Sequence, residues 1–73
     1  MGKVNIASEI TGAVWKITAQ AGQTLGAGEP LMILESMKME IPVVSEEGGV
    51  VSDILVKEGD AVQEGQVVAI MDS

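Results

Sequence analysis

Lys38 stands between two methionines and two glutamates, in the segment Glu35-Ser36-Met37-Lys38-Met39-Glu40. Apolar runs at 31–34 and 41–44 flank this segment and predict two strands joined by a tight hairpin. The tip of such a hairpin is the most exposed part of a sheet. We therefore expect the amine of Lys38 to face solvent, where it can act as a nucleophile once it loses its proton.

The turn between the two strands predicts a role for Met37 and Lys38. Two-residue hairpin turns need a positive φ, so Asn-Gly or Gly-Gly normally occupies them. Methionine and lysine do not favour that conformation, and the backbone gives no reason for either residue at this place. We infer that a binding partner reads their side chains. The alternative is an ordinary surface lysine with two exposed methionines.

The sequence around Lys38 resembles the acceptor motif of the biotinyl/lipoyl-attachment family, whose usual form is Ala/Ser-Met-Lys-Met. Here the motif is Ser36-Met37-Lys38-Met39, and residues 33–42 are especially similar to small free-standing biotin/lipoyl attachment proteins. The resemblance covers nearly the whole chain, because four glycines fall where the family keeps its turn glycines. These are Gly12, Gly22, Gly28 and Gly59.

The resemblance implies a biotin carboxyl carrier, in which biotin protein ligase joins biotin to the ε-amine of Lys38 through an amide. Met37 and Met39 would be recognised by that ligase, since methionine side chains are flexible and polarizable. Glu35 and Glu40 would either bind the ligase or keep the hairpin soluble. The further partners implied are biotin carboxylase and carboxyltransferase subunits or domains, which do the chemistry while biotin carries CO₂ between them.

Two other functions stay open. Lipoyl domains usually have Glu-Thr or Glu-Ser before Asp-Lys-Ala, and Glu35-Ser36 matches that pattern, so lipoate is a second candidate cofactor. The methionines on both sides of Lys38 match the biotinyl pattern and favour biotin. A third possibility is an unmodified docking module, although such a module has no need of Met-Lys-Met. Residues 15–22 continue without the inserted thumb of the bacterial acetyl-CoA carboxylase carrier, which favours a thumbless type.

Composition excludes several functional classes. The chain has neither cysteine nor histidine, so it offers no Ser-His or Cys-His dyad and no Cys-based metal site. We therefore expect a carrier and not an enzyme. A net charge of −7 argues against nucleic acid and anionic membranes as partners. No apolar stretch approaches 18 residues, and we expect a cytoplasmic, monomeric chain whose residues 1–73 form a single domain.

The sequence repeats itself after 37 positions without a gap. Such a short repeat implies that neither half can bury its apolar face alone, so the halves must pack together about a pseudo-two-fold axis. The family fold implied by the resemblance agrees with this: an all-β flattened barrel, or barrel-sandwich hybrid, of two four-stranded antiparallel sheets. The identical pairs include Ser8 and Ser45, Gly12 and Gly49, Gly22 and Gly59, and Gly28 and Gly65.

The repeat and the spacing of apolar residues make further predictions. Apolar positions in the second strand of each half are three and then two residues apart, which predicts a β-bulge near Lys16 and Asp53. The hairpin tip joins the two halves, so Lys38 and the chain termini should lie at opposite ends. Pro42 suits an edge strand or a bulge. We also expect Trp15 to be a core or rim anchor, and Gly49 and Gly12 to adopt positive φ.

Overall fold

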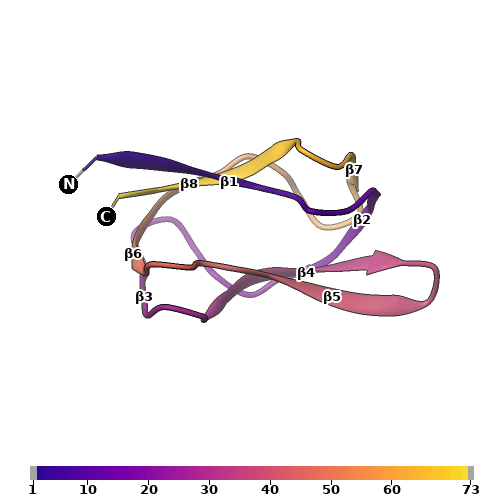
Figure 1. The fold of residues 1–73 in the computed structure, drawn as a ribbon, viewed down its shortest axis with the longest axis horizontal. Coiled ribbons are helices and arrows are strands. Elements are labelled where there is room, and N and C mark those ends of the chain that lie inside the picture. Colours follow the sequence, from indigo (N-terminus) through magenta and orange to yellow (C-terminus); the bar gives the residue numbers. More distant parts are fainter. Residues whose placement is uncertain (1, 73) are drawn as a thin grey trace.

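The computed structural model describes residues 2–72, which form eight strands in two four-stranded antiparallel sheets (Figure 1). One sheet has the order β1 (Lys3–Ala7), β8 (Val67–Asp72), β6 (Gly49–Ile54) and β3 (Thr24–Leu25). The other has the order β5 (Met39–Val44), β4 (Pro30–Ser36), β2 (Gly12–Ile17) and β7 (Ala61–Val62). No helix occurs among these residues, and the predicted all-β flattened barrel is confirmed.

Residues related by the 37-residue repeat make equivalent backbone hydrogen bonds in the two halves. Gly28 donates its N–H to the carbonyl of Ser45 at 2.6 Å, and Gly65 donates to Ser8 at 2.7 Å. Each bond joins a turn of one half to the end of a strand in the other half. Strand order follows the same rule, because β5-β4-β2-β7 repeats β1-β8-β6-β3 with the halves exchanged. Neither half is a separate folding unit, as the repeat predicted.

A β-bulge interrupts the second strand of each half, as predicted. The register of β2 against β4 shifts between Val14 and Lys16, and that of β6 against β8 shifts between Val51 and Asp53. The bulge also rules out the core position for Trp15, one of the two positions that were predicted for it. Two consecutive side chains, Trp15 and Lys16, face outward, so Trp15 is 49% exposed and is not a core residue.

The core is aliphatic and lies between the two sheets. Val14, Leu34 and Val51 are almost completely buried within it. The two buried polar residues among those described, Ser8 and Ser45, are repeat mates and both are hydrogen bonded. Ser8 Oγ donates to the carbonyl of Ile10 at 2.6 Å, and Ser45 Oγ accepts from the N–H of Gly48 at 2.8 Å. Both turns are thus held without an unsatisfied polar group.

The two glycines expected at positive φ differ. Gly49 has φ of 134°, as predicted, whereas Gly12 is not among the described residues with positive φ, so that prediction was wrong. Gly12 is needed for a different reason. A Cβ at this position would lie 2.5 Å from the backbone carbonyl oxygen of Glu35, far inside normal contact distance. The glycine lets β2 approach the end of β4 closely.

The molecule is elongated, with extents of 35 × 17 × 17 Å, and the β4–β5 hairpin lies at one end (Figure 1). Met1 and Ser73 lie outside the described residues, but their neighbours Lys3 and Asp72 pair at the other end and form an ion pair of 3.0 Å. The hairpin tip therefore points away from the described terminal residues, as predicted. Pro42 lies on the edge strand β5, which is also as predicted. No helix among residues 2–72 is long and apolar enough to cross a membrane.

Candidate functional site

The tip of the β4–β5 hairpin is a two-residue turn. Ser36 pairs with Met39 as the last pair of the ladder, which leaves Met37 and Lys38 as the two central residues. Their φ angles are 51° and 66°, the left-handed region that a two-residue hairpin turn of this kind requires. They are the only described residues other than glycine with positive φ. Each such residue costs roughly 1–2 kcal/mol, so these side chains are present despite the backbone preference.

The side chains of the tip face solvent. Met37 is 93% exposed and Met39 is 59% exposed, so neither methionine packs in the core. Lys38 is exposed as well, and its amine makes no hydrogen bond or ion pair with any residue from 2 to 72. The ion pair found in that part of the chain belongs to Lys3. The amine of Lys38 is therefore free to react, with a flexible apolar side chain on each side.

The base of the hairpin is held firmly, in contrast to its tip. Ser36 Oγ donates a hydrogen bond to the carbonyl of Thr11 at 3.0 Å, and Thr11 Oγ1 accepts from the N–H of Glu64 at 3.1 Å. Gly12 lets the backbone of β2 approach Glu35 closely. The hairpin is thereby fixed as far as Ser36. Sequence reasoning missed Thr11 as a support, because the sequence does not show which loop lies beside Ser36.

Glu35 and Glu40 lie directly opposite each other in the ladder, one pair below Ser36 and Met39. Side chains of successive residues in a strand point to opposite faces. The two carboxylates therefore share one face of the hairpin, and Ser36 and Met39 share the other. Both glutamates are exposed, and like charges directly opposite each other repel slightly. The structure thus brings together all five predicted site residues, within the last two ladder pairs and the turn.

The chemistry available at the tip is limited to one amine, two thioethers and two carboxylates. No group of three or more acidic or other ligating side chains among residues 2–72 is arranged to hold a metal ion. A free, exposed lysine on a fixed base fits a cofactor that is held by a single covalent bond, since no surrounding pocket is needed. An amide to a carboxylic acid is such a bond.

Comparison with known proteins supports the same interpretation. Residues 3–71 match the biotin/lipoyl family model, which is described as "Biotin-requiring enzyme". The biotin/lipoyl attachment protein of Bacillus subtilis is 42% identical over 65 residues, which cover 89% of each chain. The biotinylated protein TB7.3 homolog of Mycobacterium leprae is 39% identical over 67 residues, covering 92% of this chain and 94% of the relative.

A solved structure shares the fold. The urea carboxylase of Kluyveromyces lactis superposes with a TM-score of 0.93 and 38% identity, over 99% of this chain and 6% of that much longer one. The family match covers nearly all of the chain, and two relatives of similar length are about 40% identical to it. This protein belongs to the biotin/lipoyl attachment family.

Proposed function

We propose that this protein is a biotin carboxyl carrier whose cofactor is joined to Lys38. The observation that carries the proposal is the hairpin turn, where Met37 and Lys38 occupy left-handed positions and stay exposed. A structural turn would be more stable with Asn-Gly. The side chains are therefore kept for recognition and attachment, and the methionines beside the lysine match the biotinyl form of the motif.

Each residue of the tip has a distinct part in this proposal. Lys38 supplies the amine that forms the amide. Met37 and Met39 are the apolar contacts that biotin protein ligase recognises, because their exposed thioether side chains can adapt to a partner surface. Glu35 and Glu40 lie on the other face from Met39 and supply negative charge beside the attachment point. Ser36 and Thr11 hold the base of the hairpin.

The chain positions its cofactor and leaves the chemistry to partners. Biotin, when bound, supplies a ring nitrogen that can carry CO₂. The rigid base and the long lysine side chain give a fixed pivot with a flexible arm, which raises the local cofactor concentration to roughly the millimolar range. The proposed partners are biotin carboxylase and carboxyltransferase subunits or domains. We place the chain, as a monomer, in the cytoplasm with them.

Intact mass spectrometry tests the cofactor assignment. The chain is produced together with a biotin protein ligase and biotin, and separately with a lipoate ligase and lipoate. We expect the biotinyl mass in nearly all molecules of the first sample and the unmodified mass in most of the second. A chain that stays unmodified with the biotin ligase would overturn the proposal.

Lipoyl attachment is the second candidate function. Glu35-Ser36 before the tip matches the lipoyl form of the motif, and the similar Bacillus subtilis protein is described as attaching biotin or lipoyl. The same mass measurement separates the two candidates. A lipoyl mass in most of the molecules from the second sample would make lipoate a second cofactor. A lipoyl mass there with no biotinyl mass in the first would make this a lipoyl carrier.

A further inference from the structure

A groove lies on one side of the molecule, between the edge strands of the two sheets. Its volume is about 310 Å³, and it is lined by β1, β5 and the loops that follow them. Ligand pockets typically measure roughly 300–1,000 Å³. This groove is at the small end of that range and has room for a few side chains, not for a folded partner. It is separate from the turn at Lys38, since neither Met37 nor Lys38 lines it.

The repeat builds the groove from matching residues of the two halves. β1 and β5 are repeat mates, and so are Leu34 and Met71, which are completely buried at its floor. Ile6 on β1 and Val43 on β5 are a further pair of mates. The floor is therefore aliphatic and continuous with the core. The accessible apolar surface of the groove comes from Ile6, Ile10 and Ile41, which line it and are only partly buried. Such surface is more favourable when a partner covers it than when water does.

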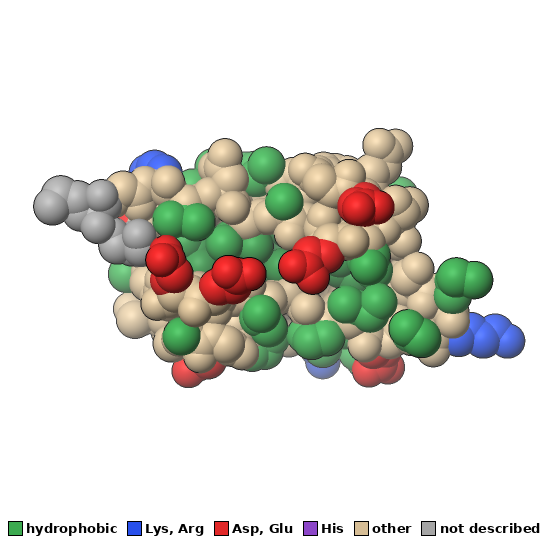
Figure 2. Space-filling view, in the orientation of Figure 1, with side chains coloured by type: hydrophobic (Ala, Val, Ile, Leu, Met, Phe, Trp, Pro, Cys, Tyr) green, Lys and Arg blue, Asp and Glu red, His purple; other side chains and the backbone are tan. Residues whose placement is uncertain are grey.

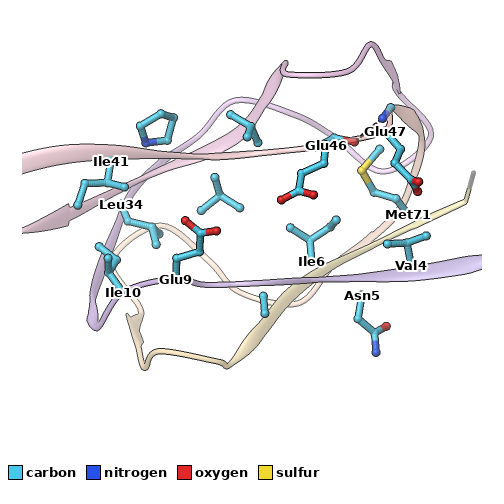
Figure 3. A pocket seen from close by; sticks show the side chains of 16 residues that line it. Val4, Asn5, Ile6, Glu9, Ile10, Leu34, Ile41, Glu46, Glu47 and Met71 are labelled. Atoms are coloured by element: carbon cyan, nitrogen blue, oxygen red, sulfur yellow. Dashed lines mark hydrogen bonds between the residues drawn. The ribbon is translucent and has the colours of Figure 1, made fainter.

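The rim of the groove is acidic. Glu9, its repeat mate Glu46, and Glu47 all line the opening and are exposed. Figure 3 shows the carboxylates of Glu9 and Glu46 directed toward each other across the opening. Acidic side chains also gather over apolar ones on this face of the molecule in Figure 2. No lysine is among the described residues of the lining, so nothing there balances the charges, and like charges that face each other repel.

We propose that the groove binds an extended segment of a partner protein that inserts a lysine or arginine flanked by aliphatic residues. Both basic side chains have an aliphatic stem that covers apolar surface and a charged head that stays at its edge. The stem would lie on Ile6 and Ile41, which are only partly buried, and the head would lie between Glu9 and Glu46. The flanking aliphatic side chains would cover the rest of the floor. This role is additional to the carrier function and does not depend on it.

Other occupants match the groove less well. A metal ion would satisfy the carboxylates but leave the aliphatic floor in water, and no metal-binding cluster is found among residues 2–72. An apolar or acidic segment would leave the carboxylates without a partner. Backbone pairing along β5 is limited by Pro42, which has no N–H to donate.

Nuclear magnetic resonance with three synthetic peptides tests the proposal. The probes are the blocked peptide Ser-Val-Lys-Ile-Arg-Val-Ser, a version with Glu for Lys and Arg, and a version with Ser for the aliphatic residues. The protein is the full unmodified chain labelled with ¹⁵N. We expect the first peptide to shift the amide signals of residues 4–7, 41 and 43–47 with saturation. We expect the other two to bind at least about tenfold more weakly, a difference of about 1.4 kcal/mol.

Two double variants with equal charge separate a local site from a general charge effect. Glu9→Gln with Glu46→Gln should weaken the first peptide about tenfold or more. Asp53→Asn with Glu64→Gln removes the same charge outside the groove lining and should leave binding unchanged. Equal weakening in both variants, equal binding of the acidic peptide, or shifts confined to other residues would each overturn the proposal. So would groove signals that move with protein concentration alone, because the occupant would then be a second copy of the chain.

Discussion

Met37 and Lys38 occupy backbone positions that their own side chains disfavour. Both have positive φ and neither is glycine, asparagine or aspartate, the residues that adopt this region readily. Met37 is also nearly fully exposed, so burial of its side chain does not offset the cost of its positive φ. The stability lost at the turn is the kind that proteins give up at functional sites. The proposed recognition of the tip would account for these two residues, which folding does not require.

Replacing Met37 with Asn separates the two roles of this residue. Asparagine adopts positive φ more readily, so Met37→Asn should stabilise the chain by about 0.5–1 kcal/mol and slow biotinylation. In a domain of this size the gain is a rise in Tm of roughly 2–8 °C. Thermal unfolding and the initial rate of biotin incorporation measure the two effects.

Met39→Ala is the control for that variant. Met39 lies in the β5 ladder and is not at positive φ, so this change should slow biotinylation without stabilising the chain. If both variants incorporated biotin at the parent rate, the methionines would have no role in recognition.

The strands and turns act as a support that ends just below the acceptor. The ladder between β4 and β5 continues to Ser36 and Met39, and Thr11 fixes Ser36 from the neighbouring loop. Gly48, just before β6, and Gly49, its first residue, both have positive φ, at 81° and 134°. Their repeat mates Thr11 and Gly12 do not, so the two halves use different backbone conformations at this point.

Gly49→Val should therefore destabilise the chain by about 1–3 kcal/mol, because a β-branched residue is strained at this φ. Thr24→Val is the control. It changes an exposed position opposite Val50 in the same sheet and should change stability by no more than about 0.5 kcal/mol. Urea unfolding of both variants gives the comparison. A loss well under 1 kcal/mol at Gly49 would mean that valine fits this turn without strain.

At the scale of the whole molecule, the repeat places the acceptor and the described terminal residues at opposite ends of a body 35 Å long. The chain has a net charge of −7, and Lys38, the proposed acceptor, is one of only four lysines. Partners that meet the hairpin end should therefore be basic, and salt should slow the encounter.

Removal of the paired carboxylates tests this steering. Glu35→Gln with Glu40→Gln should lower the rate of association with biotin protein ligase and flatten its dependence on salt. Asp53→Asn with Glu29→Gln removes equal charge away from the tip, since Glu29 lies at the opposite end of β4 from Ser36, and should have a smaller effect. The first variant should also be slightly more stable, because two like charges no longer lie opposite each other. Stopped-flow rates from low to high salt that were the same in all three proteins would argue against steering.

Much of this architecture could be predicted because the repeat constrains it. Matching glycines and aliphatic residues predicted the pairing of the halves, and irregular spacing predicted the bulges at Lys16 and Asp53. The sequence could not decide between core and rim for Trp15, because a bulge turns one extra residue outward and the sequence does not show which one. The positive φ predicted for Gly12 was wrong, because Gly12 and its repeat mate Gly49 are needed for different reasons. Gly12 avoids a clash with the carbonyl of Glu35, whereas Gly49 adopts a positive φ. The groove between β1 and β5 is a gap between strands, which no residue pattern reveals.

The attachment site is tested most directly by peptide mass spectrometry of two lysine variants, Lys38→Arg and Lys16→Arg, each produced with biotin protein ligase. Arginine keeps the charge at the exposed tip, but its guanidinium stays protonated and is a poor nucleophile. We expect Lys16→Arg to carry biotin on the peptide containing Lys38 in the same yield as the parent chain, and Lys38→Arg to carry none while its Tm is unchanged. Biotin on the Lys38→Arg chain, or on any other lysine of the parent, would contradict the assignment.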